Sequence, residues 1–85
     1  MRISIKDLER LADQLNKETN APMQPYSKGS ANIGNFHISQ AYGGCALHLM
    51  SNEHGGVHDI FGYHMPKREL YDKIMGYMTL SHLTK

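Results

Sequence analysis

The sequence predicts an α+β fold in which a three-stranded antiparallel β-meander lies between two helices that pack on one of its faces (α-β-β-β-α). Apolar residues recur at helical spacing in residues 4–19 and again, after a proline, in residues 66–83. Between them, in residues 33–64, apolar and polar side chains alternate as in strands, and two glycine pairs interrupt the alternation. At 85 residues the chain is short enough to form a single domain, residues 1–85.

The first predicted helix, residues 4–19, has a start signal and one apolar face. Ser4 is placed to cap the helix and Asp7 to complete a capping box, with Ile3 and Leu8 as the hydrophobic staple. The apolar stripe consists of Ile5, Leu8, Leu11, Ala12 and Leu15. We therefore expect this helix to dock on the rest of the fold by that stripe.

Residues 20–31 are predicted to form a loop. Pro22, Pro25 and Gly29 interrupt any helix there, and the segment is long for a connection in so small a domain. A loop of this length is often functional, and simple wrapping over the core explains it equally well. Tyr26 is its candidate binding residue.

The first hairpin of the meander is expected to turn at Gly43 and Gly44. Glycine accepts positive φ at both central positions of such a turn. This turn pairs Tyr42 with Cys45, Gln40 with Leu47 and Ile38 with Leu49. The pairing gathers the apolar residues on one face, so Cys45 is expected to be buried there as a small hydrophobic residue.

The second hairpin is expected to turn through residues 53–55. That turn places Val57, Phe61 and Tyr63 on the core face. It also places Asp59 on that face, where a carboxylate is poorly suited. A shift of one residue would instead turn Ile60 inward, so both registers stay open.

The opposite face of the sheet is predicted to carry His37, His48 and His58, with Met50 between His37 and His58. Three imidazoles can form a zinc site. Few carboxylates lie nearby in the sequence to orient such ligands, so we expect neither a metal nor another cofactor. The alternative is a binding face for a ligand or protein partner, formed by these four residues and Tyr26.

The second predicted helix, residues 66–83, begins at Pro66. Its apolar stripe comprises Leu70, Ile74, Tyr77 and Met78, extended by Leu80 or Leu83. Gly76 predicts a bend or a close helix crossing. Lys67 and Arg68 lie in the first turn, where backbone amides favour anions, and form a candidate anion-binding site.

Composition and charge narrow the classes of function. Cys45 is the only cysteine, and no uninterrupted apolar segment is long enough for a signal peptide or a membrane span. We therefore expect a cytoplasmic protein. The net charge of +1 argues against nucleic-acid binding. No catalytic motif is evident, so we expect no enzyme. A core this small favours self-association, and a homodimer is expected.

Three segments, "LADQLNKETNAPMQPYSKG", "NIGNFHISQAYGGCALHLMSNEHGGV" and "HMPKRELYDKI", resemble a family of small proteins of unassigned function encoded by tailed bacteriophages and prophages. The resemblance covers most of the chain and implies the cytoplasm of an infected bacterium as its setting. A non-enzymatic accessory protein that binds a host component, for host takeover or against a host defence, is the leading hypothesis. The alternative is a dimeric module that binds a nucleotide-like or other phosphorylated ligand, and weak nucleic-acid binding is a third.

Overall fold

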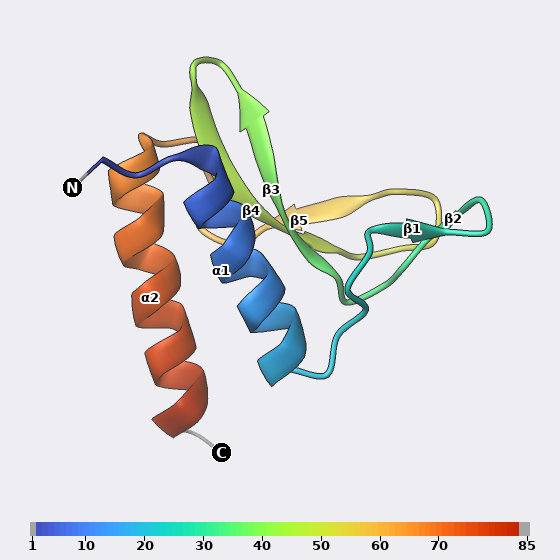
Figure 1. The fold of residues 1–85 in the computed structure, drawn as a ribbon. Coiled ribbons are helices and arrows are strands. Elements are labelled where there is room, and N and C mark those ends of the chain that lie inside the picture. Colours follow the sequence, from blue (N-terminus) through green and yellow to red (C-terminus); the bar gives the residue numbers. More distant parts are fainter. Residues whose placement is uncertain (1, 84–85) are drawn as a thin grey trace.

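The structure, a computed structural model, describes residues 2–83; of residues 81–83 it describes the backbone alone. The elements in chain order are α1 (Ile5–Glu18), β1 (Tyr26–Ser27), β2 (Ser30–Ala31), β3 (Phe36–Ala41), β4 (Gly44–Met50), β5 (Val57–Asp59) and α2 (Lys67–Leu83). Strands β3, β4 and β5 form an antiparallel sheet in that order, and both helices lie on the same side of it (Figure 1). The predicted α+β fold is confirmed.

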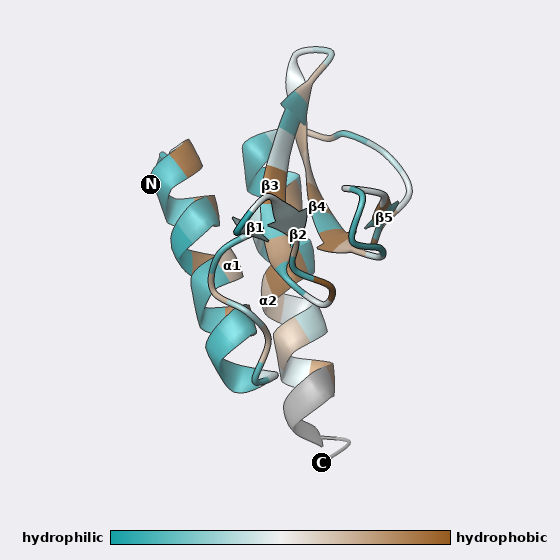
Figure 2. Ribbon diagram, turned by 90° about the vertical axis from the view of Figure 1, so that its right-hand side faces the viewer, coloured by the Kyte–Doolittle hydropathy of each residue, from teal (hydrophilic) through white to brown (hydrophobic). Residues whose placement is uncertain are grey.

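Helix α1 begins with the predicted capping box. The Asp7 N–H donates to Ser4 Oγ at 3.3 Å, and the Ser4 N–H donates to Asp7 Oδ2 at 2.9 Å. Ile3 and Leu8 are both buried, as the staple requires. The outward side of the helix is hydrophilic (Figure 2).

The main core lies between the two helices and the sheet, because α1 packs over β3 and α2 packs over β4. Its largest fully buried side chains are Leu8, Leu15, Leu47, Met65, Leu70 and Ile74. Cys45 is 2% exposed and belongs to this core, as predicted. Gly76 does not mark a close helix crossing, because a Cβ placed there would meet no atom within 4 Å. The Leu83 side chain lies outside the described residues.

Residues 20–31 are not only a loop. Strands β1 and β2 form a short hairpin there, with Ser27 opposite Ser30. The hairpin docks on the turn that follows β4, since the Ala31 N–H donates to the Glu53 carbonyl at 3.0 Å. The Tyr26 hydroxyl lies against Gly55 of the same turn. The segment therefore folds against the sheet as a small unit.

The turn between β3 and β4 consists of Tyr42 and Gly43, so the predicted Gly43-Gly44 turn was wrong. The φ angles of Tyr42 and Gly43 are 56° and 73°, and positive φ at both central residues is typical of a two-residue hairpin turn. The register is therefore displaced by two residues from the predicted one, and Ile38 lies opposite Leu47. A displacement of two residues keeps every side chain on its predicted face.

Gly44 is needed for another reason than the turn. A Cβ at this position would lie 3.1 Å from both the backbone nitrogen and the backbone oxygen of Met65. Cys45 and Met65 exchange two backbone hydrogen bonds of 2.8 Å, which hold the Met65 backbone against the strand. Gly44 thus permits a close approach between segments far apart in the sequence.

The register of β4 with β5 differs from the predicted one by a single residue. Met50 pairs with Val57, Leu49 with His58 and His48 with Asp59. This shift moves Asp59 to the histidine face and His58 to the other, as the alternative register implied. Ile60 accordingly packs against the core.

Candidate functional site

Four aromatic rings form a continuous row on the face of the sheet that is turned away from the helices. In order they belong to Tyr42, His64, His48 and His37. Each neighbouring pair is edge-to-face with 5.8 Å between ring centroids. Such geometry is favourable for aromatic pairs. We call this set the ring row.

Three segments bring the ring row together. His37 of β3 lies directly opposite His48 of β4. His64 lies in the irregular segment after β5, which folds back onto the sheet and is anchored by the bonds of Met65 to β4. Tyr42 occupies the β3–β4 turn and is 97% exposed. One end of the row is thus wholly open to solvent, whereas the three histidines are half-buried.

Hydrogen bonds orient the histidines. The Asn35 side chain is 1% exposed and donates to the Pro22 carbonyl, which leaves its Oδ1 to accept from His37 Nδ1 at 3.2 Å. Ser39 Oγ lies 3.3 Å from His64 Nε2. These contacts come from residues that are themselves held in the fold, so they fix the rings before any partner arrives.

The electrostatic environment favours neutral imidazoles in the middle of the row. Burial lowers the pKa of His37, and the neighbouring His48 lowers it further. Burial also lowers the pKa of His48, against the opposing effect of Asp59, whose Oδ2 lies 3.8 Å from His48 Nε2. At neutral pH these two rings are therefore uncharged and able to both donate and accept hydrogen bonds.

Among the side chains that the structure describes, no group of three or more His, Cys, Asp or Glu is arranged to hold a metal ion. His48 contacts His37 on one side and His64 on the other, in both cases edge-to-face. The arrangement suits contact with a partner surface better than coordination.

The structure brings together only some of the predicted binding residues. His37 and His48 are adjacent, whereas His58 is exposed on the opposite face of the sheet. The prediction that Met50 lies between His37 and His58 was therefore wrong, because Val57 and not His58 is the β5 residue opposite Met50. Met50 is 1% exposed and therefore cannot reach a partner. Its backbone bonds to Gly34 and Asn35. Tyr26 is 57% exposed on the β1–β2 hairpin, apart from the ring row.

Sequence reasoning missed two members of the ring row and its carboxylate. Tyr42 was assigned to the strand rather than the turn, and Asp59 to the core face. His64 was missed because the meander was expected to extend to residue 64, whereas its last strand ends at Asp59. The poor fit of the Asp59 carboxylate on the core face was the signal in the sequence that favoured the alternative register of the second hairpin, shifted by one residue.

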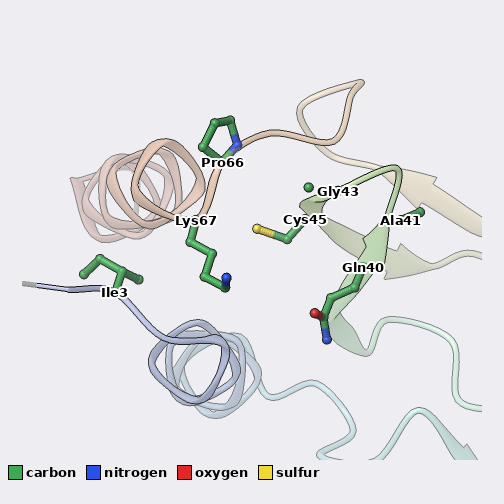
Figure 3. Close-up of a pocket in the computed structure, with 8 residues that line it drawn as sticks. Ile3, Gln40, Ala41, Gly43, Cys45, Pro66 and Lys67 are labelled. Carbon is green, nitrogen blue, oxygen red and sulfur yellow. The ribbon is translucent and has the colours of Figure 1, made fainter.

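A separate pocket lies at the start of α2. Its volume is about 640 Å³, and the Lys67 side chain extends into it between Ile3, Cys45 and Gln40 (Figure 3). Arg68 lies elsewhere and pairs with Asp72 at 3.6 Å. The predicted pair of cations is therefore not gathered at one site.

Cys45 lies on the wall of this pocket with its thiol turned to the backbone. Its Sγ donates to the Met65 carbonyl at 3.3 Å. Burial raises the pKa of the thiol, opposed by the charge of Lys67. A protonated, hydrogen-bonded thiol is a poor nucleophile.

No family model, curated protein or solved structure matches the chain. Among residues 2–83, neither helix has the length and apolar character needed to span a bilayer.

Proposed function

We propose that this chain is a non-enzymatic accessory protein of a bacteriophage, which binds a protein of the infected bacterium through the ring row. The observation that carries the proposal is Tyr42, a ring that is 97% exposed at a φ of 56°. A non-glycine residue other than Asn or Asp costs about 1–2 kcal/mol in this conformation. Strain of this kind at an exposed residue is typical of functional positions.

The chemistry of the ring row fits a protein partner. Tyrosine is enriched among the residues that contribute most to protein interfaces. His64 supports the Tyr42 ring from behind, and the neutral His48 and His37 extend an aromatic surface that still offers hydrogen bonds. Because His37 and His64 are already held by Asn35 and Ser39, these two rings require little further ordering on binding.

The proposed setting in an infected bacterium rests on the resemblance that the three sequence segments suggest to phage and prophage proteins. In that setting the chain would act by occupying a surface of a host protein. Host takeover and the blocking of a host defence are both served by such binding.

The experiment compares three forms of the protein as bait in a bacterial lysate. We expect the wild type to retain a discrete host protein, and Tyr42→Asn to weaken that binding by about 30-fold, which is the loss of about 2 kcal/mol typical of a dominant interface residue. Met75→Ser changes an exposed residue of α2, on the other side of the sheet, and should bind as the wild type does. Retention that does not depend on Tyr42, or no retention at all, would contradict the proposal.

A second candidate function is the binding of a small phosphorylated ligand, favoured by the pocket that contains Lys67. A single cation at a helix start can hold a phosphate. Inorganic phosphate or a nucleotide at 100 times its Kd should then stabilise the wild type by about 2.7 kcal/mol, and Lys67→Gln should remove the effect. Lys17→Gln, in the last turn of α1, is the matched control. The absence of any thermal shift would leave this function without support.

A further inference from the structure

The outer edge of β3 has backbone groups that no neighbouring strand uses. In an antiparallel pair, successive residues direct their N–H and C=O groups alternately toward the partner strand and away from it. Cys45 and Leu47 of β4 bond to residues of the 60–65 segment, on the side away from β3. Gln40 and Ile38 lie opposite them. Their N–H and C=O groups therefore point away from β4, toward the open edge.

Only the beginning of this edge is closed. The Asn16 side chain donates to the Phe36 carbonyl at 3.0 Å and accepts from the Phe36 N–H at 2.7 Å, as a neighbouring strand would. No described group outside the sheet bonds to the backbone of Ile38 or Gln40. β3 also contains no Lys, Arg, Asp, Glu or Pro, the residues with which proteins commonly protect an exposed edge.

A groove of about 500 Å³ reaches this edge at Ile38. It is lined by the start of β3 (residues 36–38), by Glu9, Ala12 and Asp13 of α1, and by the loop with Met23 and Pro25. Grooves beside an open strand edge are the recurring site for the addition of an extended peptide, whose backbone bonds to the strand while its side chains enter flanking pockets.

The α1 wall gives the groove a negative charge. Glu9 and Asp13 line it, both exposed, and neither forms an ion pair with another described residue. We propose that the edge of β3 at Ile38 and Gln40 binds an extended peptide segment that carries a lysine or arginine side chain. The groove and the ring row share His37, but the addition of a peptide to this edge does not depend on the function proposed above.

A second copy of this chain is a poor occupant of the same edge. Strands that pair lie about 4.8 Å apart, whereas packed helices need 8–10 Å between their axes. Because α1 packs over β3, pairing β3 with its counterpart would force the two α1 helices too close together. An extended segment without a helix above it meets no such obstacle.

The test uses a displayed library of random ten-residue peptides, selected on the wild-type protein and counter-selected on Gln40→Pro. Proline removes the outward N–H of residue 40, which the β3–β4 pairing does not use. We expect the selected peptides to contain lysine or arginine and to slow amide hydrogen exchange at Ile38 and Gln40 at least tenfold. Gln40→Thr keeps the N–H and should bind the same peptides.

A second pair of variants keeps the test valid if Gln40→Pro perturbs folding. Glu9→Gln with Asp13→Asn should weaken the selected peptides at least fivefold and reduce the salt dependence of binding, whereas Asp72→Asn on α2 should not. Peptides without a basic residue, or peptides that leave the exchange of Ile38 and Gln40 unchanged, would overturn the proposal. So would exchange protection that rises with protein concentration alone, because a second copy would then occupy the edge.

Discussion

The side chain of Asn16 satisfies both backbone groups of Phe36, although 20 residues separate the two in sequence. Asn16 is 1% exposed, so this contact joins the last turns of α1 to the start of β3 inside the protein. It fixes how far α1 is shifted along the sheet, and it ends the open edge of β3 at Phe36.

Replacing Asn16 by alanine should destabilise the protein strongly. The change leaves the N–H and C=O of Phe36 buried without partners, and each unsatisfied group costs about 1–3 kcal/mol. We expect a loss of about 2–4 kcal/mol in the free energy of unfolding, measured by urea denaturation. Gln14→Ala, on the exposed side of the same helix, should change it by less than about 0.5 kcal/mol. Equal effects of the two substitutions would show that the Asn16 contact is not formed.

The two glycines of the β3–β4 hairpin should respond differently to substitution. Gly44→Ala places a Cβ against the Met65 backbone, and such overpacking typically costs about 1–3 kcal/mol. Gly43→Asn should be nearly neutral, because asparagine accepts positive φ and the space around this position is open. Thermal unfolding of both variants measures the difference. If Gly43→Asn were the less stable variant, the result would instead support a turn formed by Gly43 and Gly44.

Much of the fold could be predicted from local sequence signals. The capping box at Ser4 and the apolar stripes identified both helices, and the alternation of side chains assigned the two faces of β3 and β4 correctly. The turn could not be placed by the same means, because Gly44 is explained by contact with Met65, distant in sequence. The sequence pattern alone could not show whether Gly44 is required for a close backbone contact or for a turn.

The candidate site was predicted only in part, for a related reason. His37 and His48 lie on strands whose alternation is clear, so their shared face could be predicted. His58 and Asp59 exchanged faces because a one-residue difference in the second turn reverses every side chain of β5. His64 follows no periodic pattern, since it lies in an irregular segment whose position is set by bonds to β4.

The strain at Tyr42 predicts a difference between two variants that both lack the ring. Tyr42→Asn places at φ 56° a residue that accepts this conformation, and Tyr42→Ala places one that does not. We expect the asparagine variant to be more stable than the alanine variant by about 0.5–1 kcal/mol in urea denaturation. Equal stabilities would indicate that the turn does not hold residue 42 at positive φ.

Stability should fall as the pH is lowered from 7.5 to 5.5. In the unfolded chain the pKa of histidine is about 6.5, whereas burial holds the pKa values of His37 and His48 below that in the folded state. The unfolded state therefore binds protons first, and the free energy of unfolding declines as the pH falls through 6.5. Asp7, whose pKa is lowered by its bonds to Ser4, contributes only below this range.

The variant His48→Gln provides the comparison for this pH dependence. It removes one of the two groups, so its loss of stability between pH 7.5 and 5.5 should be smaller than that of the wild type. Urea midpoints at the two pH values measure both losses. A wild type that gains stability on acidification would contradict the neutral state inferred for these rings.

Site-specific photo-crosslinking tests the proposed function most directly. A photoreactive phenylalanine analogue is placed at position 42 in one form of the protein and at position 75 in another, and each is irradiated inside bacterial cells. We expect a discrete crosslinked host protein from position 42, at the exposed end of the ring row, and none from position 75 on α2. The same adducts from both positions, or no adduct from position 42, would contradict the proposed function.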